Sequence, residues 1–584
     1  MFSSMFRFHK YESQTIEVHI VLERAAQKLS LTKLCTKALE KIELRLLMSS
    51  VFNRYKYRLA TAKSSASRQV ISRLISTSHY DVAIIGGGHN ALVSACYLSK
   101  HNKKVCLLEK RPEFGGATQS VYAFPGVPAK LSRYSYLVAL FPDQIKKDLR
   151  LEFETFSRSV SWYAPHEEGG VLLNRVFDEA SRKSLEDFAG TSEVLAWERF
   201  YEKIGRVAEK LAPTLLEPLM SEEEVRCLIG EDAWTEFVEQ PLSVTLDKYF
   251  TNDLIKGIVL TDGLIGTWTT AEDKLASICF LYHLIGNGTG EWRVPNGGMG
   301  ALVGSLLCRA KELGVNLRSD SEVTRVELSD TGVHLVANGE EITSDILLSG
   351  ASPAVLEKLT GIPPSTTCRD GCQIKVNMVL ERLPRLNSGI DPKQAFAGTY
   401  HINESYDQLR KAFTQAESGE IPDEIPAEMY CHTLTDSSIL DKPMVDAGNH
   451  TLTLFALHTP AFLFDKDHDE RKAEVTKRIM NGLNQHLAEP IESLILKDSC
   501  GNPCLEVKTP QELEKEIGLP RGNIFHGDLS WPWRGDKDQR RWGAETSHAR
   551  VFVAGAGALR GGGVSGIAGH NAAMATLERL KRER

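Results

Sequence analysis

Residues 80–99 read YDVAIIGGGHNALVSACYLS, which is an apolar run, three glycines and then a helical pattern. The run at 81–85 is short and nearly all apolar, as expected for a parallel strand that is buried on both faces. Behind the glycines at 86–88, apolar residues recur at helical spacing. A strand, a glycine turn and a helix in this order predict a segment that binds the pyrophosphate of a dinucleotide.

A second strand and an acid complete this unit. The stretch KVCLLE at 104–109 predicts a strand that ends in Glu109. A carboxylate at this place accepts hydrogen bonds from a ribose hydroxyl, while the helix N-terminus and its dipole stabilise the phosphates. Ala91 replaces the third glycine of the usual pattern and still allows the helix to pack closely on the strand. Together these features predict a βαβ dinucleotide unit.

The stretch EKRPEFGG at 109–116 indicates which dinucleotide binds. An acid followed by a glycine doublet resembles the extended signature of FAD-binding chains, whereas a plain surface turn is the alternative. The next segment, ATQSVYAFPGV, has no cysteine, which excludes a redox disulfide there. We therefore predict FAD as the cofactor. The binding residues predicted from the two loops are Gly86, Gly87, Gly88, His89, Asn90, Ala91, Glu109, Lys110, Arg111, Gly115 and Gly116.

Composition excludes several classes of protein. The 584 residues are 42% hydrophobic and 25% charged, as in ordinary globular chains of more than one domain. A net charge of −7 argues against a nucleic-acid partner, and no apolar run reaches the roughly 18 residues of a transmembrane helix. The 11 cysteines show neither a CxxC pair nor zinc-finger spacing, so we expect free thiols and no metal. The acidic run 222–224 predicts a solvated helix start.

The first 79 residues are set apart by charge. From 44 to 80 there is no acid, but there are seven Lys or Arg residues and many Ser and Thr residues. This pattern resembles a mitochondrial transit segment, and the alternative is a basic tail that binds acidic membrane surfaces. Residues 1–47 fit less well because they contain several glutamates, so we hypothesise that Met48 is an alternative start. The predicted location is the mitochondrial matrix or the matrix face of the inner membrane.

Three later segments carry a resemblance. VPNGGMGAL at 294–302, NIFHGDLS at 523–530 and GGGVSGIAGHNAA at 561–573 follow the two glycine loops in consistent order. The set resembles carotenoid and retinoid oxidoreductases of the phytoene desaturase type, from about residue 80 to the C-terminus. The resemblance implies an α/β fold, in which a discontinuous Rossmann-like FAD-binding domain has an inserted α+β substrate domain, as in amine oxidases.

The resemblance also implies domain limits and further site residues. The FAD-binding domain would comprise 80–150, 290–352 and 505–584, the substrate domain 151–289 and 353–504, and the N-terminal extension 1–79. Val323 would lie by the adenine, Gly563 and Val564 would face the flavin ring, and Gly555 would also bind the cofactor. One departure stands out, because Leu559 and Arg560 occupy the place where relatives tend to have His-Pro.

The chemistry expected is hydride transfer from an apolar or amine-type small molecule to the flavin. Such a reaction needs no conspicuous acid–base group, and no catalytic residue is predicted. Tyr282 and His283 either line a substrate pocket or belong to the core, and the core is favoured for His283. Trp531 and Trp533 either pack in the core or form a pocket wall. Two alternatives are a low-turnover flavoprotein that assists a mitochondrial inner-membrane protein and a cofactor-free escort protein. A second dinucleotide loop is absent from the sequence, which argues against NAD(P)H.

Overall fold

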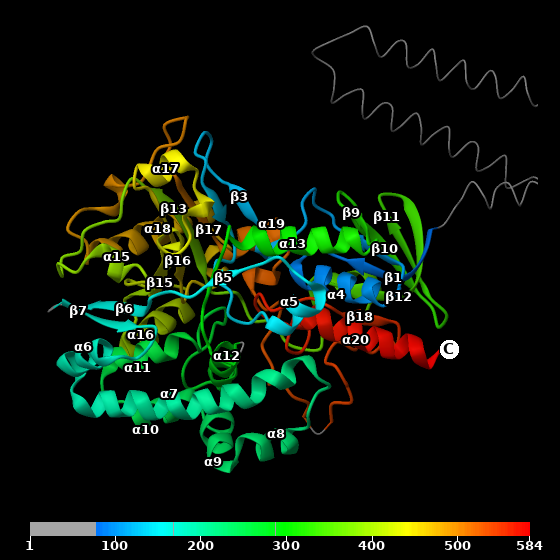
Figure 1. The fold of residues 1–584 in the computed structure, drawn as a ribbon, viewed down its shortest axis with the longest axis horizontal. Helices are drawn as coiled ribbons and strands as arrows, with labels where there is room; N and C mark the ends of the chain where they lie inside the picture. The colour runs from blue at the N-terminus through cyan, green and yellow to red at the C-terminus, as the bar shows by residue number, and fades with distance from the viewer. Residues whose placement is uncertain (1–77, 167–168, 287, 536, 584) are drawn as a thin grey trace, which may run out of the picture. The chain divides into compact units, whose positions relative to one another are not determined.

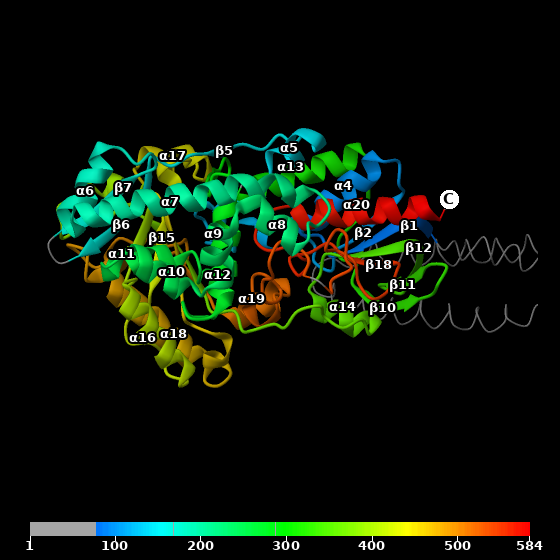
Figure 2. The same cartoon turned by 90° about the horizontal axis from the view of Figure 1, so that it is seen from below.

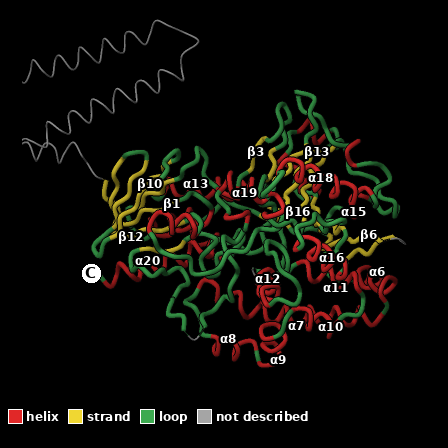
Figure 3. Tube along the Cα trace, turned by 180° about the vertical axis from the view of Figure 1, so that it is seen from behind, coloured by secondary structure: helices red, strands yellow, loops and turns green. Residues whose placement is uncertain are grey.

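The structure, a computed structural model, describes residues 78–166, 169–286, 288–535 and 537–583. The predicted transit segment and the alternative start at Met48 lie outside these residues. Figure 3 shows that the described strands gather in two separate groups, with helices and loops between and around them.

The first sheet is built around β1, which the apolar run after Ser78 forms. β1 pairs in parallel with both β2 and β12, and its residues from Val82 to Ile85 are buried, as predicted for a strand covered on both faces. The strand order is β10-β11-β12-β1-β2-β9, and β18 pairs in parallel with β12. The strands are β1 (Ser78–Ile85), β2 (Val105–Leu108), β9 (Asn316–Arg318), β10 (Val323–Leu328), β11 (Val333–Ala337), β12 (Glu340–Ser349) and β18 (Val551–Val553).

Three helices cover one face of this sheet. α4 (His89–Lys100) packs against both α13 (Met299–Glu312) and α20 (Ile567–Arg582), so the last helix of the chain lies beside the first one described (Figure 1). α4 is buried from its first residue through Ser99. Because α4 is buried on all sides, apolar residues occur all around it rather than on one face.

The second sheet is mainly antiparallel. Its order is β17-β13-β16-β15-β14-β6-β7, and only β14 and β6 run parallel. The strands are β6 (Val160–His166), β7 (Gly169–Asn174), β13 (Ile374–Leu380), β14 (Thr399–Ile402), β15 (Ala427–Tyr430), β16 (His450–Ala456) and β17 (Leu505–Lys508). Two short pairs join β3 (Ser120–Tyr122) to β4 (Lys130–Ser132) and β5 (Thr155–Phe156) to β8 (Val294–Pro295).

A layer of helices packs against β6 and β7 (Figures 1 and 2). The long helix α7 buries Val194, Trp197, Phe200 and Ile204, which recur every three or four residues and so lie on one face. The remaining helices are α5 (Asp143–Leu149), α6 (Glu179–Ala189), α7 (Thr191–Leu211), α8 (Glu222–Ile229), α9 (Glu231–Trp234), α10 (Leu242–Tyr249), α11 (Asp253–Thr261), α12 (Lys274–Ile285), α14 (Pro353–Thr360), α15 (Pro392–Ala395), α16 (Tyr406–Glu417), α17 (Lys442–Asp446), α18 (His468–Asn484) and α19 (Pro510–Ile517).

Two expectations from the sequence meet the structure here. The acidic run 222–224 does begin a helix, because Ser221 caps α8 and forms a reciprocal capping box with Glu224. The α/β fold class is confirmed as well. The expected limit at residue 505 divides the second sheet, however, because β17 pairs with β13 rather than with any strand of the first sheet. Residues 78–584 form one compact unit, so the division into six segments stays a proposal.

Candidate cofactor and substrate site

Two positions in the loop between β1 and α4 require glycine, one for its backbone angle and one for lack of space. Gly86 has a φ of +89°, in the region that favours glycine, and a Cβ added to Gly87 would lie 2.6 Å from the Phe114 ring. Gly88 differs, because a Cβ added there meets nothing within 4 Å. Gly88 lines a cavity and directly precedes α4, so its missing side chain leaves space at a helix N-terminus.

Glu109 ties the two loops together. Its carboxylate is 8% exposed and accepts hydrogen bonds from the backbone N–H groups of Gly87, at 2.6 Å, and of Arg111, at 2.9 Å. The N–H of Gly115 donates to the carbonyl of Gly87 at 2.8 Å. The carboxylate is therefore fixed at the end of β2, beside the glycine loop.

One cavity of about 580 Å³ brings the predicted binding residues together. It is lined by segments that lie far apart in the chain and meet at the carboxyl ends of the parallel strands, where α/β sheets bind ligands. Gly115 does not line it and supports the loop from behind. The predicted residues that line it are Gly86, Gly87, Gly88, His89, Asn90, Ala91, Glu109, Lys110, Arg111, Gly116, Val323, Gly555, Gly563 and Val564.

Buried polar atoms in this cavity are left for a ligand. His89 Nε2, Asn90 Oδ1, Arg111 Nη1 and His526 Nδ1 are buried and have no hydrogen-bond partner among the described residues. Unpaired buried polar atoms are expensive in a folded protein, so they are expected at binding sites. Burial lowers the pKa of both His89 and His526 to about 4, which keeps the two imidazoles neutral at pH 7. The open glycine cradle and these atoms fit a large polar ligand such as a dinucleotide.

Lys375 is a residue of this cavity that sequence reasoning missed. It lies on β13 among apolar neighbours and is 1% exposed. Its Nζ donates to Asn377 Oδ1 at 2.8 Å and lies 4.9 Å from the centre of the Tyr136 ring. Burial lowers its pKa to about 7. A lysine in a mainly apolar strand is the one signal in the sequence that could have drawn attention to it.

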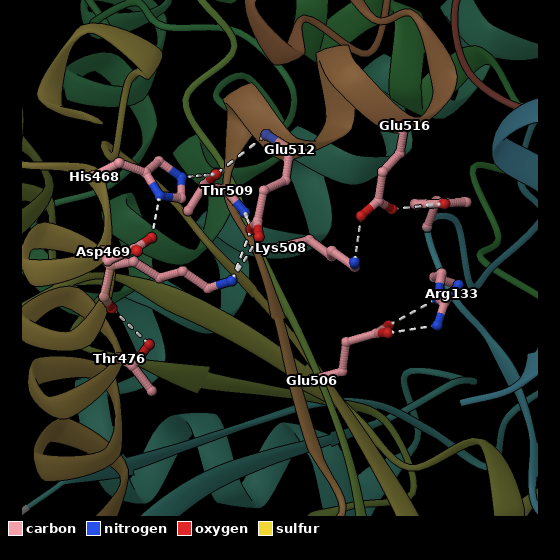
Figure 4. Close-up of polar contacts among 11 residues, drawn as sticks. Arg133, His468, Asp469, Thr476, Glu506, Lys508, Thr509, Glu512 and Glu516 are labelled. Carbon is pink, nitrogen blue, oxygen red and sulfur yellow. Dashed lines mark hydrogen bonds and ion pairs between the residues drawn. The ribbon is translucent and has the colours of Figure 1, made fainter. Parts of the chain in front are cut away.

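α19 forms part of the cavity wall through Leu513 and Ile517. Thr509 caps this helix in a reciprocal capping box with Glu512. Figure 4 shows the polar contacts that hold it, in which Lys508 reaches Glu516 at 2.5 Å and Glu512 also receives Lys472 from α18. The wall is therefore fastened to the second sheet.

The structure shows where the four aromatic residues with open alternatives lie. His283 is 2% exposed, its Nδ1 contacts the carbonyl of Asp262 at 2.8 Å, and it also lines the cavity. Tyr282 donates from its hydroxyl to the carbonyl of Gly562 at 2.8 Å. Trp531 and Trp533 stack with ring centres 5.0 Å apart; Trp533 belongs to the helical core, and Trp531 packs against that core. These two tryptophans therefore act in packing.

Arg560, the departure noted in the sequence, serves the fold. It is 2% exposed and has a φ of +63°. Its guanidinium donates to the carbonyls of Thr214 and Glu217, at 2.9 and 3.0 Å, and to that of Trp542 at 3.2 Å. The side chain thus joins the glycine-rich C-terminal segment to the loop after α7.

A second cavity of about 520 Å³ adjoins the first, because Ile265 and Trp292 line both. Aromatic and aliphatic side chains form much of its wall, including Trp162 and Trp197. Buried charged groups also line it, and burial is the main cause of their pKa shifts. The pKa of Glu428 is raised to about 8 and that of Asp262 to about 6.

Comparison with known proteins places the chain. A family profile described as an NAD(P)-binding Rossmann-like domain matches residues 84–144. An uncharacterized protein of Mycobacterium tuberculosis is 40% identical over 529 residues, which cover 86% of this chain and 98% of the relative. The chain belongs to the same family. Pyridine nucleotide-disulfide oxidoreductase domain-containing protein 2 of Rattus norvegicus is 28% identical over 566 residues, covering 86% of this chain and 94% of that protein.

Solved structures agree on the fold. A variant of putrescine oxidase aligns with a TM-score of 0.53 at 15% identity, over 87% of this chain and 100% of that one. Cyclohexylamine oxidase from Brevibacterium oxydans aligns with a TM-score of 0.51 at 12% identity, over 86% and 100% of the two chains. The resemblance read from the motifs is confirmed, because the relatives include the oxidoreductase domain-containing protein and the fold is shared with these solved structures. In the described part of the chain, no helix has the length and apolar character that crossing a membrane requires.

Proposed function

We propose that the chain is an FAD-dependent oxidoreductase that oxidises an apolar or amine-type small molecule. The observation that carries this proposal is the single cavity in which Gly88, Glu109, Val323 and Gly563, from distant segments, meet. Bound there, FAD would supply a two-electron acceptor for hydride. The glycine loop and the N-terminus of α4 would hold the pyrophosphate, and Glu109 would hold a ribose hydroxyl.

The chain's own residues would then prepare the second cavity for a substrate. The aromatic and aliphatic part of its wall suits the apolar part of a substrate. Trp292 and Ile265 border both cavities, so a substrate beside them would lie next to the cofactor site. Lys375, whose pKa of about 7 leaves part of the population neutral at pH 7, is a group in the first cavity that can hold or release a proton at Nζ.

The visible absorption spectrum of the purified protein tests the cofactor. We expect a flavin spectrum in the parent and none in Gly88→Val, whose side chain would project into the cavity. A folded parent without flavin would overturn the proposal and favour the escort alternative. Once flavin is present, anaerobic bleaching by apolar amines and by apolar hydrocarbons distinguishes the two substrate types, while failure of every donor would favour the low-turnover alternative.

We further propose a mitochondrial location, supported by the acid-free, arginine-rich segment at 44–77. A fluorescent fusion of the whole chain is expected in mitochondria. The same fusion beginning at residue 78 is expected in the cytosol. Mitochondrial signal from the shortened fusion would contradict the assignment to this segment. Association with the matrix face of the inner membrane is the finer alternative, and salt extraction of isolated mitochondria tests it.

A further inference from the structure

His401 and Glu428 are direct partners across two strands of the second sheet. The antiparallel register of β14 and β15 pairs His401 with Glu428, so both side chains leave the same face. Glu404 follows β14 by one turn and contacts His401 Nδ1 through its Oε2. One ligand atom from each of the three residues lies within 4.8 Å of the other two.

Glu404 gives an independent sign that this cluster has a ligand. Its side chain is 0% exposed, and its Oε1 has no hydrogen-bond partner among the described residues. A buried carboxylate oxygen without a partner is among the most unfavourable groups in a protein interior. Oε2 of the same carboxylate contacts His401, so this side chain is part of the cluster.

Two further charged residues lie beside the cluster. Asp262 and Arg158 line the same cavity as His401 and Glu428. Arg158 donates to Thr399 Oγ1 at 3.1 Å, so its guanidinium is held beside β14.

We infer that His401, Glu404 and Glu428 bind one divalent first-row transition-metal ion. One imidazole nitrogen and two carboxylate oxygens are ligands that such ions accept together. Metal–ligand bonds of about 2.1 Å require ligand atoms within about 4.2 Å of one another, so short side-chain rotations close the site. Tyr430 donates its hydroxyl to Glu428 and would orient that ligand.

The site would face the second cavity. His401 and Glu428 both line that cavity, whereas Glu404 lies behind them. An ion held there would have protein ligands on one side and cavity space on the other, which is the arrangement of an open metal site. This inference does not depend on FAD, and it goes beyond the proposed oxidoreductase activity. Sequence spacing missed it because Glu428 lies on β15, whereas His401 lies on β14 and Glu404 follows that strand.

Manganese is the probe of choice, since thiols elsewhere in the chain bind it weakly. Chelator-treated full-length protein is titrated with Mn²⁺, and the electron paramagnetic resonance signal of free Mn²⁺ is followed. We expect one Mn²⁺ per chain, displaced by Zn²⁺ but not by Mg²⁺ at the same concentration. Glu404→Gln and Glu428→Gln are each expected to weaken binding at least tenfold.

A matched control is available on the surface. His334 lies 3.4 Å from Glu327 and 3.8 Å from Glu341, which repeats the residue types of the buried cluster. Glu327→Gln is expected to leave Mn²⁺ binding unchanged. Equal binding by Glu404→Gln and the parent, or no stoichiometric binding by the parent, would overturn the inference.

Thermal melting distinguishes a bound metal ion from the alternative, in which the carboxyl groups of the cluster share protons. Mn²⁺ is expected to raise the melting temperature of the parent but not that of Glu428→Gln. Without metal, Glu428→Gln replaces a buried carboxyl group by a neutral amide of similar size and is expected to melt at or above the parent's temperature. A parent that does not respond to Mn²⁺ while Glu428→Gln melts higher would show a proton-sharing cluster instead.

Discussion

The backbone N–H of Gly87 donates a 2.6 Å hydrogen bond to Glu109, joining the loop after β1 to the end of β2. The second oxygen of the same carboxylate accepts from the N–H of Arg111. Both contacts are made within the chain, so the carboxylate is already oriented when a ligand arrives. This preorganisation reduces the loss of side-chain entropy on binding.

Glu109→Gln tests that arrangement. An amide can accept through only one oxygen, so one of the two backbone donors loses its partner. Hydrogen bonds to a charged group contribute about 1.5–3 kcal/mol, and we expect flavin affinity to fall roughly tenfold or more. Fluorescence titration of flavin-free protein gives the dissociation constant. Glu113→Gln, on the exposed part of the same loop, serves as control, and equal affinities of the two variants would contradict the role of Glu109.

Neighbouring glycines are expected to differ in what they tolerate. Gly88→Val places its side chain in the cavity, and its φ of −69° suits any residue, so the variant should fold and lack flavin. Gly87→Val meets Phe114 at 2.6 Å and should be destabilised by about 1–3 kcal/mol. Urea unfolding and absorption spectra of both variants test this. If Gly88→Val unfolds as readily as Gly87→Val, the difference between the two positions is refuted.

Lys375 should make stability depend on pH. Its pKa is about 7 in the folded chain and near 10.5 when unfolded, so between these values the unfolded chain binds more protons. The free energy of unfolding therefore rises with pH from about 7 to about 10.5, and the penalty is constant below pH 7. Relative to Lys375→Met, the parent should gain on the order of 2 kcal/mol between pH 7 and 9. If the free energy of unfolding depends on pH in the same way in both proteins, the lowered pKa of Lys375 is wrong.

Arg560 should matter for stability more than for flavin binding. Arg560→Met removes a buried guanidinium that donates to three carbonyls, and we expect a loss of about 2–4 kcal/mol. Arg541→Met removes an exposed pair with Glu578 and should change stability by less than about 1 kcal/mol. Chemical denaturation gives both values. A loss of flavin without a loss of stability in Arg560→Met would assign the residue to the cofactor site.

The predictable parts of this site are those set by local sequence. The glycine loop and Glu109 belong to one βαβ unit, where spacing along the chain fixes geometry. The second sheet was harder, because its strands pair across long distances in the sequence. That is why β17 falls beyond the expected limit at residue 505 and why the pairing of His401 with Glu428 was not foreseen. Lys375 was missed for the same reason, since only the packing of β13 beside the loop at 132–136 brings it to the cavity.

The pairing of β18 with β12 has a consequence for biosynthesis. Gly555 and Gly563 follow β18 and are synthesised long after the first glycine loop, yet they line the same cavity as that loop. The cofactor cavity therefore closes only after this late segment has been made. A chain released early by a premature stop codon before residue 551 would carry the whole glycine loop and Glu109 and would still lack a closed binding site.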